Sequence, residues 1–131
     1  GVPQDHAEAV RWFRLAAEQG HADAQYNIGI SHHHGYGVQQ DHAEAVRWYR
    51  LAAEQGDVYA QNNLGVMYAE GQGVPQDYAT AHMWFNIAAA TGDENAAEYR
   101  DVAESRMTAA DISEAQRRAR VCLDSGYQDC D

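Results

Sequence analysis

The sequence predicts an all-α protein, a right-handed α/α superhelix (solenoid) of helix-turn-helix repeats that ends in a C-terminal capping helix. Internal repetition is the main observation, because residues 37–56 repeat residues 1–20 with only two substitutions. A looser third copy covers residues 73–92, so the period is 36 residues. Periods in this range mark stacked units of supersecondary structure. The hydrophobic content of 45%, with only two prolines, favours a folded chain.

The first helix of each unit, helix A, is expected to run from Asp5 to Gln19 in the first copy. Asp5 is a suitable N-cap, and Gly20 is placed to end the helix in a left-handed conformation. At about 100° per residue, small and aromatic residues fall on one stripe that we expect to pack inward. This stripe contains Ala9, Trp12, Phe13, Ala16 and Ala17, whereas the opposite face carries Arg11, Arg14 and Glu18.

Tryptophan recurs at the repeat period within this stripe, as Trp12, Trp48 and Trp84. We interpret all three as core residues rather than as a surface for stacking ligands. No helix of such a unit can bury its apolar stripe alone, so stability must come from stacked neighbours.

The second helix, helix B, is expected from Ala22 to His33 in the first unit. Glycine recurs inside helix B at Gly29 and Gly65, although it costs about 1 kcal/mol relative to alanine there. Close approach of a neighbouring helix is the expected reason. Glycine-rich loops at residues 35–37 and 71–73 are expected to set one helix pair against the next.

The periodicity fades after Gly92. Residues 93–106 are expected to form helix B of the third unit, and Thr108 to Asp111 resembles a capping box for a last helix that runs to about Ser125. The predicted organisation is one array. It comprises repeat 1 at 1–36, repeat 2 at 37–72, repeat 3 at 73–107 with a degenerate second helix, and a capping helix and tail at 108–131.

The repeated pattern reads Ala-x-x-Trp-Tyr/Phe-x-x-Ala-Ala-x-x-Gly, then Ala-Gln-x-x-Leu/Ile-Gly, then Tyr-x-x-Gly-x-Gly-Val-x-x-Asp. Its best instance is Ala45, Trp48, Tyr49, Ala52, Ala53, Gly56, Ala60, Gln61, Leu64, Gly65, Tyr68, Gly71, Gly73, Val74 and Asp77. The pattern resembles the Sel-1-like repeat, a relative of the tetratricopeptide repeat, over about residues 1–107. Such a resemblance implies an adaptor scaffold that binds a protein or peptide and carries out no chemistry of its own.

In tetratricopeptide-like stacking, the outward face of the A helices lines the concave surface. The residues expected there are Arg11, Arg14, Glu18, Arg47, Arg50, Glu54, Met83 and Asn86. A regular row of guanidinium groups could bind carboxylates on an extended peptide, because arginine binds them bidentately. The alternative is a solvated face on which the arginines pair with glutamates at helical spacing.

The run His32-His33-His34 replaces the Tyr68-Ala69-Glu70 of the second unit. Imidazole is a common ligand for zinc or nickel, which makes these histidines weak candidates for a metal site. Consecutive helical residues point about 100° apart, however, and no His-x-x-x-His pair exists to bring two rings onto one face. A solvated helix end is the favoured interpretation.

Cys122 and Cys130 are the only cysteines, and two interpretations remain open for them. They are either two free thiols or a local disulfide, which would require an oxidising compartment. The resemblance to exported bacterial repeat proteins favours the periplasm or secretion over the cytoplasm.

Charge and residue types restrict the function further. The net charge of −11 disfavours nucleic acid, and no apolar run is long enough to enter a membrane. The chain has no lysine and no serine in a nucleophile motif, so we expect no catalytic residues and no cofactor. The alternative function is a structural segment, or a module that dimerises through its open first repeat.

Overall fold

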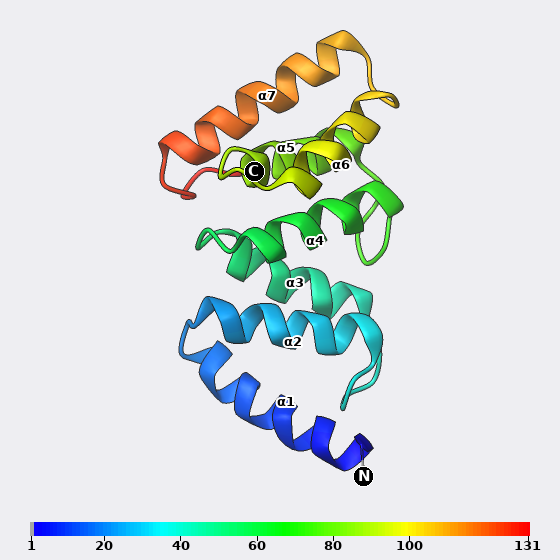
Figure 1. The fold of residues 1–131 in the computed structure, drawn as a ribbon, viewed down its shortest axis with the longest axis vertical. Coiled ribbons are helices and arrows are strands. Elements are labelled where there is room, and N and C mark those ends of the chain that lie inside the picture. Colours follow the sequence, from blue (N-terminus) through cyan, green and yellow to red (C-terminus); the bar gives the residue numbers. More distant parts are fainter. Residues whose placement is uncertain (1) are drawn as a thin grey trace.

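The computed structural model describes residues 2–131, with side chains from His6 onward, and this part of the chain contains helices and no strand. The helices are α1 (Val2–Glu18), α2 (Ala22–His34), α3 (His42–Ala53), α4 (Val58–Glu70), α5 (Tyr78–Ala89), α6 (Glu94–Glu104) and α7 (Ala109–Asp124). Figure 1 shows them stacked along one axis, with α1 and α7 at opposite ends. Each of the helices α1 to α5 packs on the helix that follows it, whereas α7 packs on α5. The predicted all-helical solenoid is therefore confirmed.

Side-chain caps explain where most of these helices begin. The caps are Asp41, Asp57, Asp77, Asp93 and Thr108, and each accepts a hydrogen bond from the backbone N–H three residues ahead. This bond satisfies one of the free N–H groups of the first turn, which stabilises a helix by about 1 kcal/mol. A capping aspartate therefore marks the start of each helix from α3 to α6.

The expected start of the first helix is wrong, because α1 begins at Val2 and Asp5 lies inside it. Before α3, the chain lies close to the backbone of α1: a Cβ added to Gly37 would lie 2.4 Å from the backbone of His6. Among the described residues, no earlier helix could hold residues 2–5 in an extended conformation in this way. These residues are therefore part of α1, and Pro3 is tolerated in the first turn of a helix.

Aromatic rings of the A helices lie directly on helix-B glycines of the preceding repeat. A Cβ added to Gly29 would lie 2.5 Å from the Tyr49 ring, and one added to Gly65 would lie 2.5 Å from the Phe85 ring. Contacts this short do not occur for real Cβ atoms, so only glycine allows the two helices to approach so closely. The reason expected for the two helical glycines is therefore confirmed.

Replacing Gly65 by alanine is expected to lower the free energy of unfolding by about 1–2 kcal/mol, as measured by urea denaturation. Overpacking against Phe85 costs about 1–3 kcal/mol, and the better helix propensity of alanine offsets up to about 1 kcal/mol. The Phe85→Leu variant is the matched background, in which the same change should cost less. Stabilisation by Gly65→Ala would contradict this packing.

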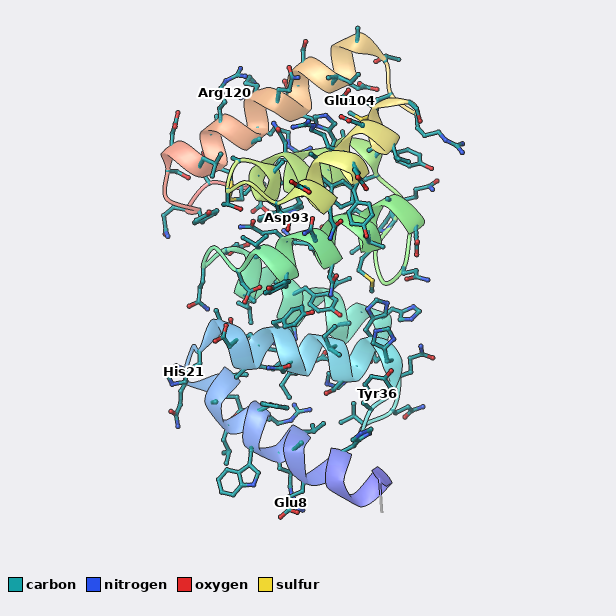
Figure 2. The ribbon with its side chains drawn as sticks, viewed as in Figure 1. Glu8, His21, Tyr36, Asp93, Glu104 and Arg120 are labelled. Carbon is teal, nitrogen blue, oxygen red and sulfur yellow. A yellow bond between two sulfur atoms is a disulfide. The ribbon has the colours of Figure 1, made fainter. Side chains whose placement is uncertain are left out.

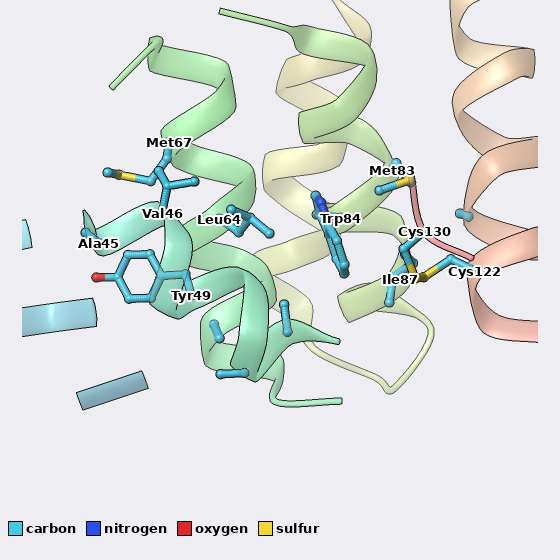
Figure 3. Close-up of a cluster of buried hydrophobic side chains, with 14 residues drawn as sticks. Ala45, Val46, Tyr49, Leu64, Met67, Met83, Trp84, Ile87, Cys122 and Cys130 are labelled. Carbon is cyan, nitrogen blue, oxygen red and sulfur yellow. A yellow bond between two sulfur atoms is a disulfide. The ribbon is translucent and has the colours of Figure 1, made fainter. Parts of the chain in front are cut away.

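The core is built from the tryptophan stripe in the second and third units but not in the first. Trp48 is 4% exposed and Trp84 is fully buried, and Figure 3 shows Trp84 among the core side chains between Leu64 and Ile87. By contrast, Trp12 is 68% exposed and Phe13 is 36% exposed. The expectation that these two residues pack inward is wrong, because among the described residues no helix covers that side of α1.

No helix within residues 2–131 combines the length and apolar character that a membrane-spanning helix needs.

Candidate protein-binding face

Charged residues recur at helical spacing on α1 and α3, and we call this set of residues the A-helix face. It consists of Arg11, Arg14, Glu18, Arg47, Arg50 and Glu54. The repeat places equivalent residues one period apart, so α1 and α3 each contribute two arginines and one glutamate. Arg11, Glu18 and Arg47 are exposed, whereas the other three are partly buried.

Arg47 is held flat against α3 by two neighbours. Its Nη2 donates to Glu44 Oε1 at 2.5 Å, and its guanidinium carbon lies 4.5 Å from the centre of the Trp48 ring. The hydrogen bond from Arg47 lowers the pKa of Glu44 below its usual value. The pair of Arg47 and Glu44 is of the kind expected for a solvated face on which arginines pair with glutamates. An exposed pair of this kind contributes little to stability. It holds the guanidinium in one position while leaving it in contact with solvent.

Arg14 and Arg50 connect the two helices of their repeats. Arg14 Nη2 lies 3.4 Å from His32 Nε2, and Arg50 donates to the hydroxyl of Tyr68, which occupies the same position one period later. Burial lowers the pKa of His32, so its neutral ring can accept from Arg14. His32 therefore replaces the tyrosine that the first unit lacks. Comparison of residues 32 and 68 across the period was the signal that could have revealed this role.

The C-terminal tail reaches back to the A-helix face at Arg50. Arg50 Nη1 lies 3.1 Å from Asp131 Oδ1, and the Tyr127 ring lies 3.4 Å from the position of a Cβ on Gly56. Burial raises the pKa of Glu54, an effect that Arg50 opposes and Asp131 reinforces. A carboxylate and an aromatic ring from the tail thus contact repeat 2 next to its arginines.

A disulfide between Cys122 and Cys130 anchors this tail to α7. Both cysteines are buried, and Figure 3 shows the bond beside Met83 and Ile87. Of the two interpretations left open by the sequence, the structure contains the disulfide.

The third repeat does not extend the A-helix face. Met83 was expected on this face but is fully buried, because α7 packs on α5 and covers it. Asn86 accepts a hydrogen bond from Arg100 Nη1 at 3.3 Å, within the same repeat. The expectation that Met83 contacts a ligand is therefore wrong, and the exposed face is confined to the first two repeats.

The three consecutive histidines do not converge. His32 turns to Arg14, whereas the rings of His33 and His34 stack with their centres 4.4 Å apart and His33 Nδ1 lies 3.0 Å from the Tyr49 hydroxyl. Burial lowers the pKa of His33, and the neighbouring imidazoles of His34 and His42 lower it further. Over the described part of the chain, no group of three or more His, Cys, Asp or Glu side chains is arranged to hold a metal ion.

A stack of helix pairs with a charged outer face defines an α-helical repeat protein of the solenoid class. The Sel1 repeat model matches residues 1–21, 22–57 and 58–93, and the chain belongs to the Sel1 repeat family. Successive full units begin at residues 22 and 58, which gives the same 36-residue period, although each unit begins at a B helix. Members of this family are generally protein-interaction scaffolds.

Two solved structures resemble the chain closely. One is c5321, a protective antigen present in uropathogenic Escherichia coli strains and displaying an SLR fold, with 37% identity and a TM-score of 0.90 over 97% of this chain. The chain spans only 28% of the length of c5321. The other is a Sel1 repeat protein from Oxalobacter formigenes, with 39% identity and a TM-score of 0.68, covering 70% of this chain and 69% of that one. No protein with a curated description matches the sequence.

Proposed function

We propose that the chain is a non-catalytic scaffold that binds an extended, carboxylate-bearing segment of a partner protein on the A-helix face of repeats 1 and 2. The contact between Arg50 and Asp131 carries this proposal. There an arginine of the face already holds a carboxylate from an irregular segment. The equivalent arginine of repeat 1 is Arg14, and Arg11 and Arg47 extend the row.

The chain is acidic overall, with a net charge of −11, but its total charge does not decide what binds at this face. At physiological ionic strength the Debye length is about 8 Å, so a ligand responds mainly to the charges beside it. The A-helix face carries four arginines and two glutamates, and the carboxylates of Glu44 and Asp131 lie beside Arg47 and Arg50. Two of these arginines, Arg11 and Arg47, are exposed and one period apart, which suits a segment that runs across both A helices.

Changing Arg11 and Arg47 together to glutamate is expected to weaken binding of an acidic peptide by about tenfold or more, since a tenfold change requires only about 1.4 kcal/mol. The probe is a fluorescein-labelled peptide of alternating glutamate and alanine. About ten residues of it span roughly 35 Å when extended. Binding is measured by fluorescence anisotropy in about 0.05 M salt, where screening is weak.

The matched control is the Arg117→Glu and Arg120→Glu double variant, which changes the net charge by the same amount. Both residues are exposed on α7, and Figure 2 shows Arg120 pointing away from the rest of the array. The control should alter affinity by less than about twofold. Equal losses in both variants, or no binding of the acidic peptide by the wild type, would refute the proposal.

A further inference from the structure

A hollow of about 450 Å³ lies beside the turns that join helix A to helix B in repeats 2 and 3. Its volume is within the range of pockets that bind a small ligand. Figure 1 shows the α3–α4 and α5–α6 turns on the same side of the stack. The residues that line the hollow include Asp23, Asp57, Tyr59, Thr91 and Asp93, and we call it the turn hollow. None of these residues belongs to the A-helix face.

A hydrogen bond that joins repeats 1 and 2 has no counterpart at the turn hollow. Gln55, in the α3–α4 turn, donates from Nε2 to Gln25 Oε1 of α2 at 2.7 Å. One period later the two positions hold Thr91 and Gln61. The shorter Thr91 donates its hydroxyl within its own turn, to the carbonyl of Ala88 at 2.7 Å. Gln61 is fully buried, and among the described residues none donates to its Oε1.

The Gln61 amide therefore presents a free acceptor toward the turn hollow. Its Nε2 donates to the carbonyl of Ala53 at 3.1 Å, as Gln25 Nε2 does to the carbonyl of Ala17 one period earlier. This shared contact places Gln61 Oε1 as Gln25 Oε1 is placed, facing residue 91 of the next turn. A buried acceptor without a donor is unfavourable, so a ligand that supplies an N–H group here gains affinity.

The three aspartates of the turn hollow lack a positive partner. None of Asp23, Asp57 and Asp93 forms an ion pair with any described basic side chain. Burial raises the pKa of Asp57, a hydrogen bond from the backbone of Ala60 lowers it, and the charge of Asp23 raises it. A cation bound beside Asp57 would oppose the repulsion between these carboxylates.

Tyr59 adds an exposed aromatic ring to the turn hollow. It is 68% exposed, and the equivalent positions in the other two repeats hold Asp23 and Asn95. Its ring centre lies 5.9 Å from that of Tyr26 of α2, so the ring rests against the array. Aromatic faces attract cations, and arginine more often than lysine. The ring and the aspartates therefore favour the same kind of ligand.

Arginine matches all three features of the turn hollow. Its planar guanidinium carries five N–H donors, binds carboxylates bidentately and stacks on aromatic rings. Within this chain Arg47 shows the combination, because it lies over the Trp48 ring while it donates to Glu44. A lysine ammonium has three donors and no plane that could stack on a ring.

We propose that the turn hollow binds an arginine side chain of a partner protein. The guanidinium lies over Tyr59 and pairs with Asp57 and Asp93. One of its N–H groups donates to Gln61 Oε1, in the place that the Gln55 amide takes one period earlier. The ligand is opposite in charge to the one proposed for the A-helix face, and neither site depends on the other.

Thr91→Gln tests the proposal without a change of charge. The new amide should donate to Gln61 Oε1 as Gln55 does to Gln25, and it should fill the space that the guanidinium needs. The probe is the peptide acetyl-Gly-Arg-Gly-amide, titrated into the ¹⁵N-labelled protein in about 0.05 M salt, where screening is weak. In the wild type, resonances of Tyr59 and of the α5–α6 turn should shift. The variant should bind the peptide at least about fivefold more weakly, which corresponds to about 1 kcal/mol.

Thr91→Ser is the matched control, because it keeps a short side chain with a hydroxyl group. Its affinity for the peptide should stay within about twofold of the wild type. A Thr91→Gln variant that keeps the helical circular dichroism of the wild type and binds the peptide equally well would overturn the proposal. So would a wild type that does not bind the peptide at all.

Charge variants separate a specific site from the general attraction of an acidic protein. Asp57→Asn with Asp93→Asn should weaken binding of the arginine peptide by about tenfold, and asparagine remains a suitable N-cap at both positions. The control is Asp111→Asn with Asp124→Asn, which are exposed on α7 and change the net charge equally; it should alter affinity by less than about twofold. Equal losses in both double variants, or equally tight binding of acetyl-Gly-Lys-Gly-amide by the wild type, would contradict the proposal.

Discussion

Replacing Trp84 by alanine is expected to lower the free energy of unfolding by about 3–5 kcal/mol, the usual cost of removing a buried tryptophan. Trp84 is fully buried in the cluster that joins α3, α4, α5 and α7, where Leu64 and Ile87 are also buried. Neighbours from several helices cannot all move into the space that the indole leaves. Urea denaturation followed by circular dichroism measures the loss, and Trp48→Ala should give a loss of similar size.

Trp12→Ala provides the matched control, because Trp12 has the same residue type at the same position in the repeat. Its side chain is largely exposed, so the substitution should change stability by no more than about 0.5 kcal/mol. A loss above about 2 kcal/mol would mean that Trp12 is buried as Trp84 is. Repeat 1 would then be packed differently from the structure described above.

Removing the disulfide by changing Cys122 and Cys130 to alanine is expected to lower the free energy of unfolding by about 2–3 kcal/mol. The bond closes a short loop, with a sequence separation of 8, and the loop-entropy relation gives this magnitude. The tail should also detach from repeat 2, because the disulfide anchors the segment that carries Tyr127 and Asp131. Thermal or urea unfolding, with and without a thiol reductant, measures the effect.

The control for this prediction is the reductant itself. It should destabilise the wild type by a similar amount and leave the double alanine variant unchanged. Equal stability of wild type and variant would contradict a structural role for the bond. Because disulfides persist in oxidising compartments, we also propose a periplasmic or secreted location, as the resemblance to exported repeat proteins implied.

Most of the fold could be predicted from the sequence, because residues with a structural role recur at the same position in each copy of the repeat. The 36-residue period predicted the helix pairs, and Gly29 and Gly65 indicated a close helix contact. The first helix was the exception. Its start and the burial of Trp12 depend on a neighbouring helix, and repetition alone does not reveal whether a given copy has one.

The candidate site was predictable in position but not in detail. The period identified the arginines of α1 and α3, whereas the contact between Arg50 and Asp131 joins residues 81 positions apart. Nothing local in the sequence indicates that pairing. The burial of Met83 likewise follows from the packing of α7 on α5. The pattern of residues 109–124 predicts a helix but does not indicate which earlier helix it packs on.

The most direct test of the proposed function is an NMR titration of the ¹⁵N-labelled wild-type protein with the acidic glutamate–alanine peptide. We expect chemical shifts to change at the side chains of Arg11 and Arg47 and along the backbone of α1 and α3. Resonances of Asp131 should also change, because the peptide competes for Arg50. Shifts confined to α4 and α6, with Arg11 and Arg47 unaffected, would contradict a binding role for the A-helix face.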